Sequence, residues 1–202
     1  MTRQQFSVIL LVLGLIISLL PLPKHRSLTA GPSRVLSEVT DKNNYLSVDQ
    51  VARFVINEDS SVQLIDLRSQ AEFITFNLPG SVNIPYSDFF ESDPGKFLAS
   101  SKQKIIFYSN DDIYSSYALT LGRGMNFRNT YVMKGGLNEW FNTVMNSNFK
   151  GGRITPRENA LFETRMKARK MFNDLNSLPD SLKIRYLESK KIALKKLDGG
   201  CE

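Results

Sequence analysis

Short apolar runs alternate with amphipathic stretches through the middle of the chain. Four runs have the length and composition of buried strands, and turn residues bound each of them: 62–67, 81–85, 104–108 and 130–133. Helical patterns lie between them, at residues 48–57 after Ser47, at 115–122, and at 137–145 after two glycines. Strands that alternate with helices form a parallel sheet covered on both faces. The pattern therefore predicts one α/β domain over residues 45–148.

The last fifty residues have a pattern typical of long helices. Residues 155–158 (TPRE) form a capping box with proline at the first helical position, so a helix should begin there and run to about Asn176. A second helix should begin at Pro179 and end near Leu197, before two glycines. We predict a helical hairpin over residues 153–198. Its apolar seam would comprise Leu161, Phe162, Met166, Phe172, Leu175, Leu187, Leu194 and Leu197.

The hairpin carries the excess of positive charge. The net charge is +6, and residues 1–149 hold 13 basic and 13 acidic side chains, whereas residues 150–202 hold 13 and 7. No aromatic-rich basic groove or nucleic-acid motif accompanies this excess, which argues against nucleic-acid binding. The basic residues are expected to face solvent while the seam packs. The alternative is that the two helices lie on anionic lipid.

Residues 4–23 contain no charged side chain, and residues 6–20 are almost wholly apolar. A helix of twenty residues spans about 30 Å, the thickness of the hydrocarbon core of a bilayer. A cleaved signal peptide is the alternative, but Lys24, His25 and Arg26 come directly after the run, which disfavours cleavage. Residues 1–26 are therefore predicted to be a single-pass membrane anchor.

Residues 27–44 are polar and small, with Gly31 followed by Pro32, and are predicted to be a linker. The basic residues on the two sides of the anchor do not decide its orientation. We expect a bacterial inner membrane with the domain on the periplasmic side, because short N-terminal anchors more often export the domain attached to them.

The chain has one cysteine, Cys201, and one histidine, His25. A single cysteine excludes an intramolecular disulfide, and the two residues together are too few for a Cys and His zinc site. A Ser-His-Asp site is excluded because the predicted domain has no histidine. No metal and no cofactor is predicted.

Three blocks of the middle segment resemble the rhodanese homology domain, over residues 46–144. Residues 64–73 (LIDLRSQAEF) resemble its strand-then-helix signature, 78–85 (LPGSVNIP) its glycine turn, and 135–140 (GGLNEW) its closing element. Asn77 stands where the family commonly has a histidine. The resemblance implies a rhodanese-like parallel sheet, in which Asp66, Arg68 and Glu72 serve as scaffold through charged hydrogen bonds.

Activity in the family depends on a loop of the form Cys-x-x-Gly-x-Arg, whose backbone N–H groups surround a cysteine thiolate or persulfide. Here the loop after residues 105–108 reads SNDDIYS, with Ser109 at the cysteine position, Asp112 at the glycine and Tyr114 at the arginine. A serine hydroxyl does not carry sulfane sulfur, and no general base is available to activate it. We therefore predict no catalytic residue in this loop.

Asp111 and Asp112 stand in the same loop, where their charge would oppose thiosulfate, phosphate or arsenate. One of the two, Asp111 or Asp112, is expected to cap the helix that contains Tyr114. A cation site is the alternative.

Two hypotheses about function remain open. In the first, a catalytically inactive rhodanese-like module binds a protein partner at the membrane. In the second, Cys201 carries sulfur as a persulfide on the flexible tail of residues 199–202, a Gly-Gly-Cys sequence similar over three residues to the tails of carrier proteins in bacterial thiosulfate oxidation. A cysteine on a frayed terminus with no role is the simpler reading of that tail.

Overall fold

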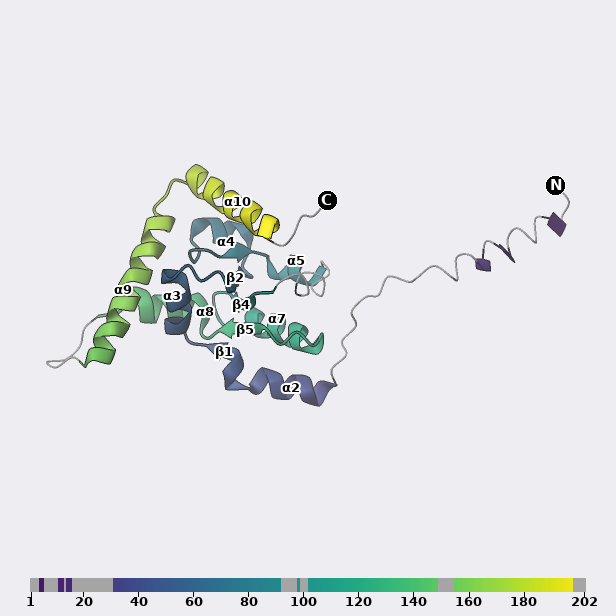
Figure 1. Ribbon diagram of the computed structural model, residues 1–202, viewed down its shortest axis with the longest axis horizontal. Helices are drawn as coiled ribbons and strands as arrows, with labels where there is room; N and C mark the ends of the chain where they lie inside the picture. Colours follow the sequence, from purple (N-terminus) through teal and green to yellow (C-terminus); the bar gives the residue numbers. More distant parts are fainter. Residues whose placement is uncertain are drawn as a thin grey trace.

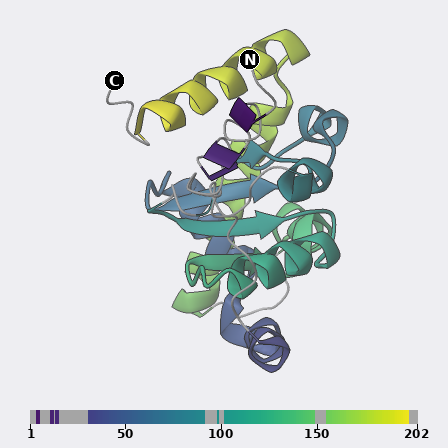
Figure 2. The same cartoon turned by 90° about the vertical axis from the view of Figure 1, so that its right-hand side faces the viewer.

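The computed structural model describes residues 4–5, 11–12, 14–15, 31–91, 98, 102–148 and 155–197. Its centre is a parallel sheet with the strand order β1-β5-β4-β2-β3, in which every pairing is parallel (Figures 1 and 2). The strands are β1 (Tyr45–Leu46), β2 (Val62–Asp66), β3 (Val82–Asn83), β4 (Lys104–Tyr108) and β5 (Thr130–Met133). The predicted α/β sheet is confirmed, with β1 as an added edge strand of two residues.

Helices cover both faces of this sheet, as predicted. One face packs on α3 (Val48–Ile56), α8 (Gly136–Trp140), η2 (Phe141–Met145) and α9 (Pro156–Asn176), and the other on α5 (Tyr86–Glu91) and α7 (Ile113–Gly124). Alternation along the strands explains the two cores. Leu64 and Ile106 point into the first core, whereas their neighbours Ile65 and Phe107 point into the second.

The segment predicted to be a linker contains a helix, α2 (Pro32–Thr40), so the prediction was wrong over those residues. Proline at the first helical position favours this start, and α2 packs against α7. Arg123 of α7 joins the two, because its guanidinium lies 3.7 Å from Glu38 and donates to the side chain of Asn44 at 2.6 Å. The chain is thus held to the domain well before β1 begins.

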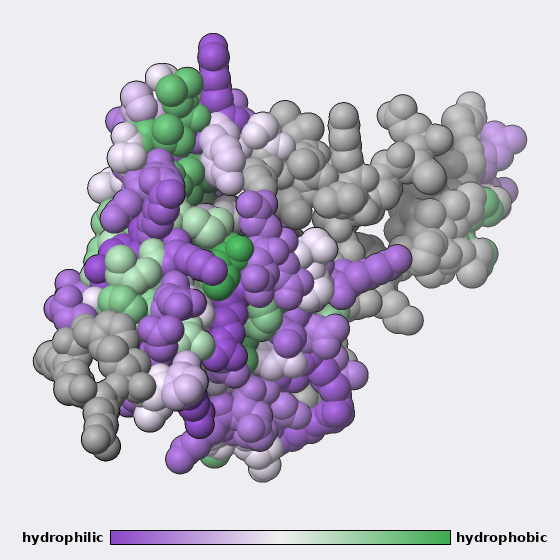
Figure 3. Space-filling model, turned by 60° about the vertical axis from the view of Figure 1, so that its left-hand side comes forward, coloured by the Kyte–Doolittle hydropathy of each residue, from purple (hydrophilic) through white to green (hydrophobic). Residues whose placement is uncertain are grey.

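The two C-terminal helices begin where predicted, and Thr155 and Glu158 form the capping box of α9. The predicted apolar seam pairs the two helices with each other, and this is wrong for α9, which packs on α3 and η2. Phe172 lies in the first core, with its ring centroid 6.4 Å from that of Trp140, and Arg165 donates to Asp49 of α3 at 2.7 Å. The first core therefore covers part of the apolar side of α9, and Met166 of the predicted seam is exposed. Hydrophilic residues dominate the view in Figure 3, which turns the α9 side of the molecule forward.

The second helix, α10 (Asp180–Leu197), lies along α4 (Gln70–Thr75). Lys183 makes this contact, since its ammonium donates to the carbonyl oxygens of Ile74 and Thr75 at 3.0 Å and to that of Asn176 at 3.5 Å. The side chain is only 1% exposed. Carbonyl groups at a helix C-terminus attract a cation, so α10 is attached through the ends of two other helices.

Most of the predicted anchor, residues 1–26, lies outside the described residues, and so does the tail of residues 199–202 with Cys201. Within the described part of the chain, no helix has the length and apolarity that crossing a membrane requires.

Candidate functional site

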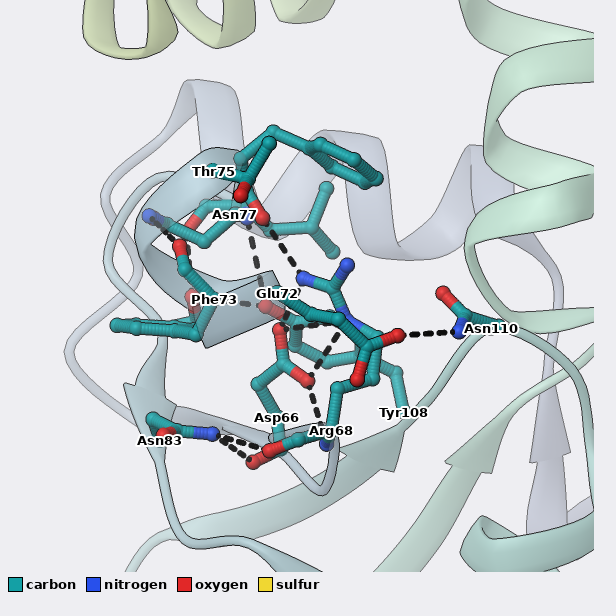
Figure 4. Close-up of polar contacts among 12 residues, drawn as sticks. Asp66, Arg68, Glu72, Phe73, Thr75, Asn77, Asn83, Tyr108 and Asn110 are labelled. Atoms are coloured by element: carbon teal, nitrogen blue, oxygen red, sulfur yellow. Dashed lines mark hydrogen bonds and ion pairs between the residues drawn. The ribbon is translucent and has the colours of Figure 1, made fainter. Parts of the chain in front are cut away.

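A buried ion pair stands at the carboxyl end of β2. The guanidinium of Arg68 donates to the Asp66 carboxylate through Nε at 3.0 Å and Nη2 at 2.6 Å, and Nη2 also donates to the Phe76 carbonyl at 2.7 Å (Figure 4). Burial alone would lower the pKa of Arg68, but the hydrogen bonds and charge of Asp66 raise it above its ordinary value. Arg68 therefore keeps its positive charge, and its contacts with Asp66 fix the end of the strand, which is the scaffold role expected from the sequence.

The glycine turn is tied to the same strand ends. The Asn83 amide donates to the carbonyl oxygens of Asp66 at 3.0 Å and Arg68 at 2.8 Å. The Tyr108 hydroxyl, at the end of β4, donates to Ser81 Oγ at 2.9 Å. Burial raises the pKa of Tyr108 well above its ordinary value, so this hydroxyl remains a neutral donor. These contacts hold the carboxyl ends of β2, β3 and β4 together under the loop that comes after β4.

Ser109 begins that loop, and its hydroxyl points inward. The residue is 1% exposed, and Oγ donates to the Asp111 carbonyl at 2.6 Å. The Asp111 carboxylate accepts the N–H of Ile113 at 2.9 Å, so the predicted capping role is confirmed for Asp111. Asp112 does not share this role, because its carboxylate accepts the N–H of Gly135. Ser109 is therefore held in a closed turn.

The glycine pair of the third block packs directly on this loop. The N–H groups of Leu137 and Asn138 donate to the carbonyl oxygens of Ser109 at 2.9 Å and Asn110 at 3.0 Å. Gly136 has a positive φ of +55°, and a Cβ atom there would lie 2.6 Å from the Ser109 oxygen. Only glycine allows this approach, so the start of α8 fixes the backbone of the loop.

Glu72 joins the loop to α4. Its carboxylate accepts from the Ser69 hydroxyl at 2.6 Å and from the Asn110 amide at 2.9 Å. The Ser69 hydroxyl, together with the weaker effect of the Asn110 amide, lowers the pKa of Glu72. A negative charge therefore stands beside the loop at neutral pH.

These elements surround a cleft of about 370 Å³. The Tyr86 and Tyr114 rings form one wall, with centroids 4.6 Å apart. The lining residues are Leu67, Arg68, Ser69, Glu72, Pro85, Tyr86, Ser87, Ser109, Asn110, Asp111 and Tyr114. They include no thiol and no imidazole. Among the residues that the structure describes, no group of three or more His, Cys, Asp or Glu side chains is placed to hold a metal ion.

Ser109 and Asp112 lie in the loop after β4, and Tyr114 lies in the first turn of α7. Ser109 and Tyr114 line the cleft, and Asp112 is not among its lining residues. Cys201 lies outside the described residues. Sequence patterns did not indicate Tyr86 and Asn110, which complete the cleft. Tyr86 comes from α5, which was not predicted, and its position depends on a backbone hydrogen bond to Leu67 at 2.9 Å. Such a long-range contact leaves no local signal in the sequence.

Comparison with known proteins agrees with this architecture. Residues 47–143 match the family model of the rhodanese-like domain, so the chain contains a rhodanese-like domain. Over 104 residues it is 28% identical to the thiosulfate:glutathione sulfurtransferase of Saccharomyces cerevisiae, covering 46% of this chain and 75% of that protein. The domain is thus related to the sulfurtransferases.

Solved structures are also similar. A human single-domain sulfurtransferase is 21% identical with a TM-score of 0.41, covering 50% of this chain and 96% of that one. A protein of unknown function from Rhodopseudomonas palustris is 20% identical with a TM-score of 0.46, covering 60% and 96%.

Proposed function

We propose that this chain is a catalytically silent rhodanese-like protein that binds a protein partner, and that residues 4–23 tether it to a membrane. The proposal depends on the identity and environment of Ser109. It occupies the position of the family's cysteine, and its hydroxyl is buried and donates to the Asp111 carbonyl at 2.6 Å. A hydroxyl that is neither ionised nor next to a base does not attack a sulfur donor.

The charges around the cleft support the same conclusion. Thiosulfate is a dianion, and its approach requires a positive potential at the loop. Tyr114 replaces the family's arginine, while Glu72 and Asp111 add negative charge to the cleft. The positive charge of Arg68 is already bound by Asp66. Sulfur donors of this kind are therefore repelled, whereas the scaffold of the domain is intact.

Sulfur transfer from thiosulfate to glutathione, with release of sulfite, tests the absence of catalysis. We expect the full chain in detergent to release no sulfite above the uncatalysed rate. Ser109→Ala serves as the matched control. Sulfite release by the wild-type chain that is lost in Ser109→Ala would contradict the proposal, because it would show that Ser109 takes part in the reaction.

A second candidate is a sulfur carrier that uses Cys201. The sequence places the sole thiol after Gly199 and Gly200, on a terminus that comes after the docked helix α10. Its thiolate would attack the sulfane sulfur of thiosulfate, form a persulfide and release sulfite. Intact-mass analysis after exposure to thiosulfate separates the candidates. A gain of one sulfur atom in wild type but not in Cys201→Ala favours the carrier, and no gain in either leaves the binding module.

A further inference from the structure

Apolar side chains gather on the surface beside the cleft. In the first two turns of α7, Ile113 is 55% exposed, Tyr114 48% and Tyr117 52%. Tyr86 of α5 joins them, with its ring centroid 4.6 Å from that of Tyr114 and 6.3 Å from that of Tyr117. We call these four residues the tyrosine face. Three exposed large side chains within five residues of one helix are more than a solvated surface needs, and they indicate a contact surface.

The cleft beside the tyrosine face is acidic. Glu72 and Asp111 line it, and the lowered pKa of Glu72 keeps that carboxylate ionised. Of the lining residues that the structure describes, Arg68 alone is cationic, and the Asp66 carboxylate lies 2.6 Å from its guanidinium. A ligand that enters the cleft therefore meets uncompensated negative charge next to stacked aromatic rings.

We propose that the tyrosine face and the cleft bind an extended, arginine-bearing segment of a partner protein. A guanidinium stacks on the face of a tyrosine ring through its planar charge, and its N–H groups pair with a carboxylate such as that of Asp111. Aromatic rings flanked by carboxylates provide both interactions at one place. This inference rests on the proposed binding function and specifies the chemistry of the partner.

Binding of a fluorescent peptide tests the inference. The probe is a peptide of alternating arginine and glycine, a matched peptide of glutamate and glycine is the control, and fluorescence anisotropy is measured on the full chain in detergent. We expect the arginine peptide alone to bind, with an affinity that falls about tenfold between low and physiological salt, because exposed charges are screened over about 8 Å at that ionic strength.

Substitutions assign the binding to this surface. Tyr114→Ala should weaken binding about fivefold or more, and Tyr114→Phe should preserve it, since the ring and not the hydroxyl stacks on the cation. Asp111→Asn should also weaken it, while its amide oxygen can still accept the N–H of Ile113. Leu182→Ala and Asp174→Asn, which change exposed residues of α10 and α9, should bind as wild type. Circular dichroism checks that each variant is folded.

Several results would overturn the inference. These are no binding of the arginine peptide, equal binding of the glutamate peptide, or unchanged binding in Tyr114→Ala. Light scattering adds another, since a dimer that Tyr114→Ala dissociates would show that a second copy of the chain covers the tyrosine face. If the peptide fails to bind and the chain still releases no sulfite from thiosulfate, the basic partner is wrong while the catalytically silent assignment stands.

Discussion

Gly136 is the residue on which the conformation of the Ser109 loop depends most directly. We expect Gly136→Ala to destabilise the fold, because its positive φ costs about 1–2 kcal/mol for any other residue and the new Cβ would overlap the Ser109 and Asn110 backbone, adding roughly 1–3 kcal/mol. Gly80→Ala is the control, since Gly80 has a φ of +77° and open space around its Cβ position. Urea unfolding of both variants measures the difference. Equal losses would show that the close approach at Gly136 has no energetic effect.

Glu72 gives a prediction about pH. Its pKa is lowered in the folded chain, first by the Ser69 hydroxyl, so its contribution to stability is full above the ordinary value of 4.5 and is lost as the pH falls through the lowered value. Glu72→Gln keeps the capping geometry and removes this titration. Because the side chain is exposed, we expect wild type to exceed the variant by less than about 1 kcal/mol at pH 7.

Thermal unfolding of wild type and Glu72→Gln from pH 7 to pH 3 measures the difference in stability between them. The difference should shrink as the pH falls below about 4.5. A difference that grows with acidity would contradict the assigned role of the carboxylate.

The sequence shows these local determinants because each depends on neighbouring residues. Examples are the capping boxes at Ser47 and Thr155, the glycine turn and the two glycines before α8. Each acts within a few positions, so its residue types can be recognised in the sequence. The contact between Tyr86 and Tyr114 joins residues of different helices. It became visible only when the fold placed α5 beside α7.

Lys183 determines how α10 attaches to the domain. Its ammonium donates hydrogen bonds to carbonyl groups at the C-termini of α4 and α9, and the side chain is buried. We expect Lys183→Met to lower the free energy of unfolding by about 1–3 kcal/mol, because buried carbonyl groups lose their donor. Amide hydrogens of α10 should then exchange faster with solvent than those of α3. Hydrogen exchange followed by mass spectrometry measures both.

Lys170→Met is the matched control, since Lys170 is an exposed lysine on α9. Unchanged exchange in α10 of Lys183→Met would mean that apolar contacts alone hold the helix.

At the level of elements, the long helices and the longer strands were predictable and their packing partners were not. Periodicity shows that α9 has an apolar side, but nothing in the sequence distinguishes a neighbouring helix from an aromatic core as its partner. In the structure the partner is the aromatic core, since the Phe172 ring packs beside Phe76, Trp140 and Phe141. The helix α2 was missed for a related reason, because so short a segment is stabilised by tertiary contacts, chiefly with α7.

At the scale of the whole molecule, the proposed tether determines which compartment the cleft faces. Residues 4–23 lack charge and have the length of a membrane span. We expect the full chain, expressed in a bacterial host, to remain in the membrane pellet after alkaline carbonate extraction, and deletion of residues 4–23 to release it. An extracted wild-type chain with a shortened N-terminus would instead indicate a cleaved signal peptide.

The orientation is testable with the native sequence, because Cys201 is the sole thiol of the chain. If the soluble part lies on the periplasmic side, a membrane-impermeant maleimide should label the chain in cells whose outer membrane has been opened, and Cys201→Ala should remain unlabelled. Labelling that requires disruption of the inner membrane would place the domain in the cytoplasm.

The side of the membrane on which Cys201 lies also constrains the alternative function, the sulfur carrier. A lone thiol in the oxidising periplasm is exposed to disulfide exchange, so a persulfide carried there would need protection by a bound partner.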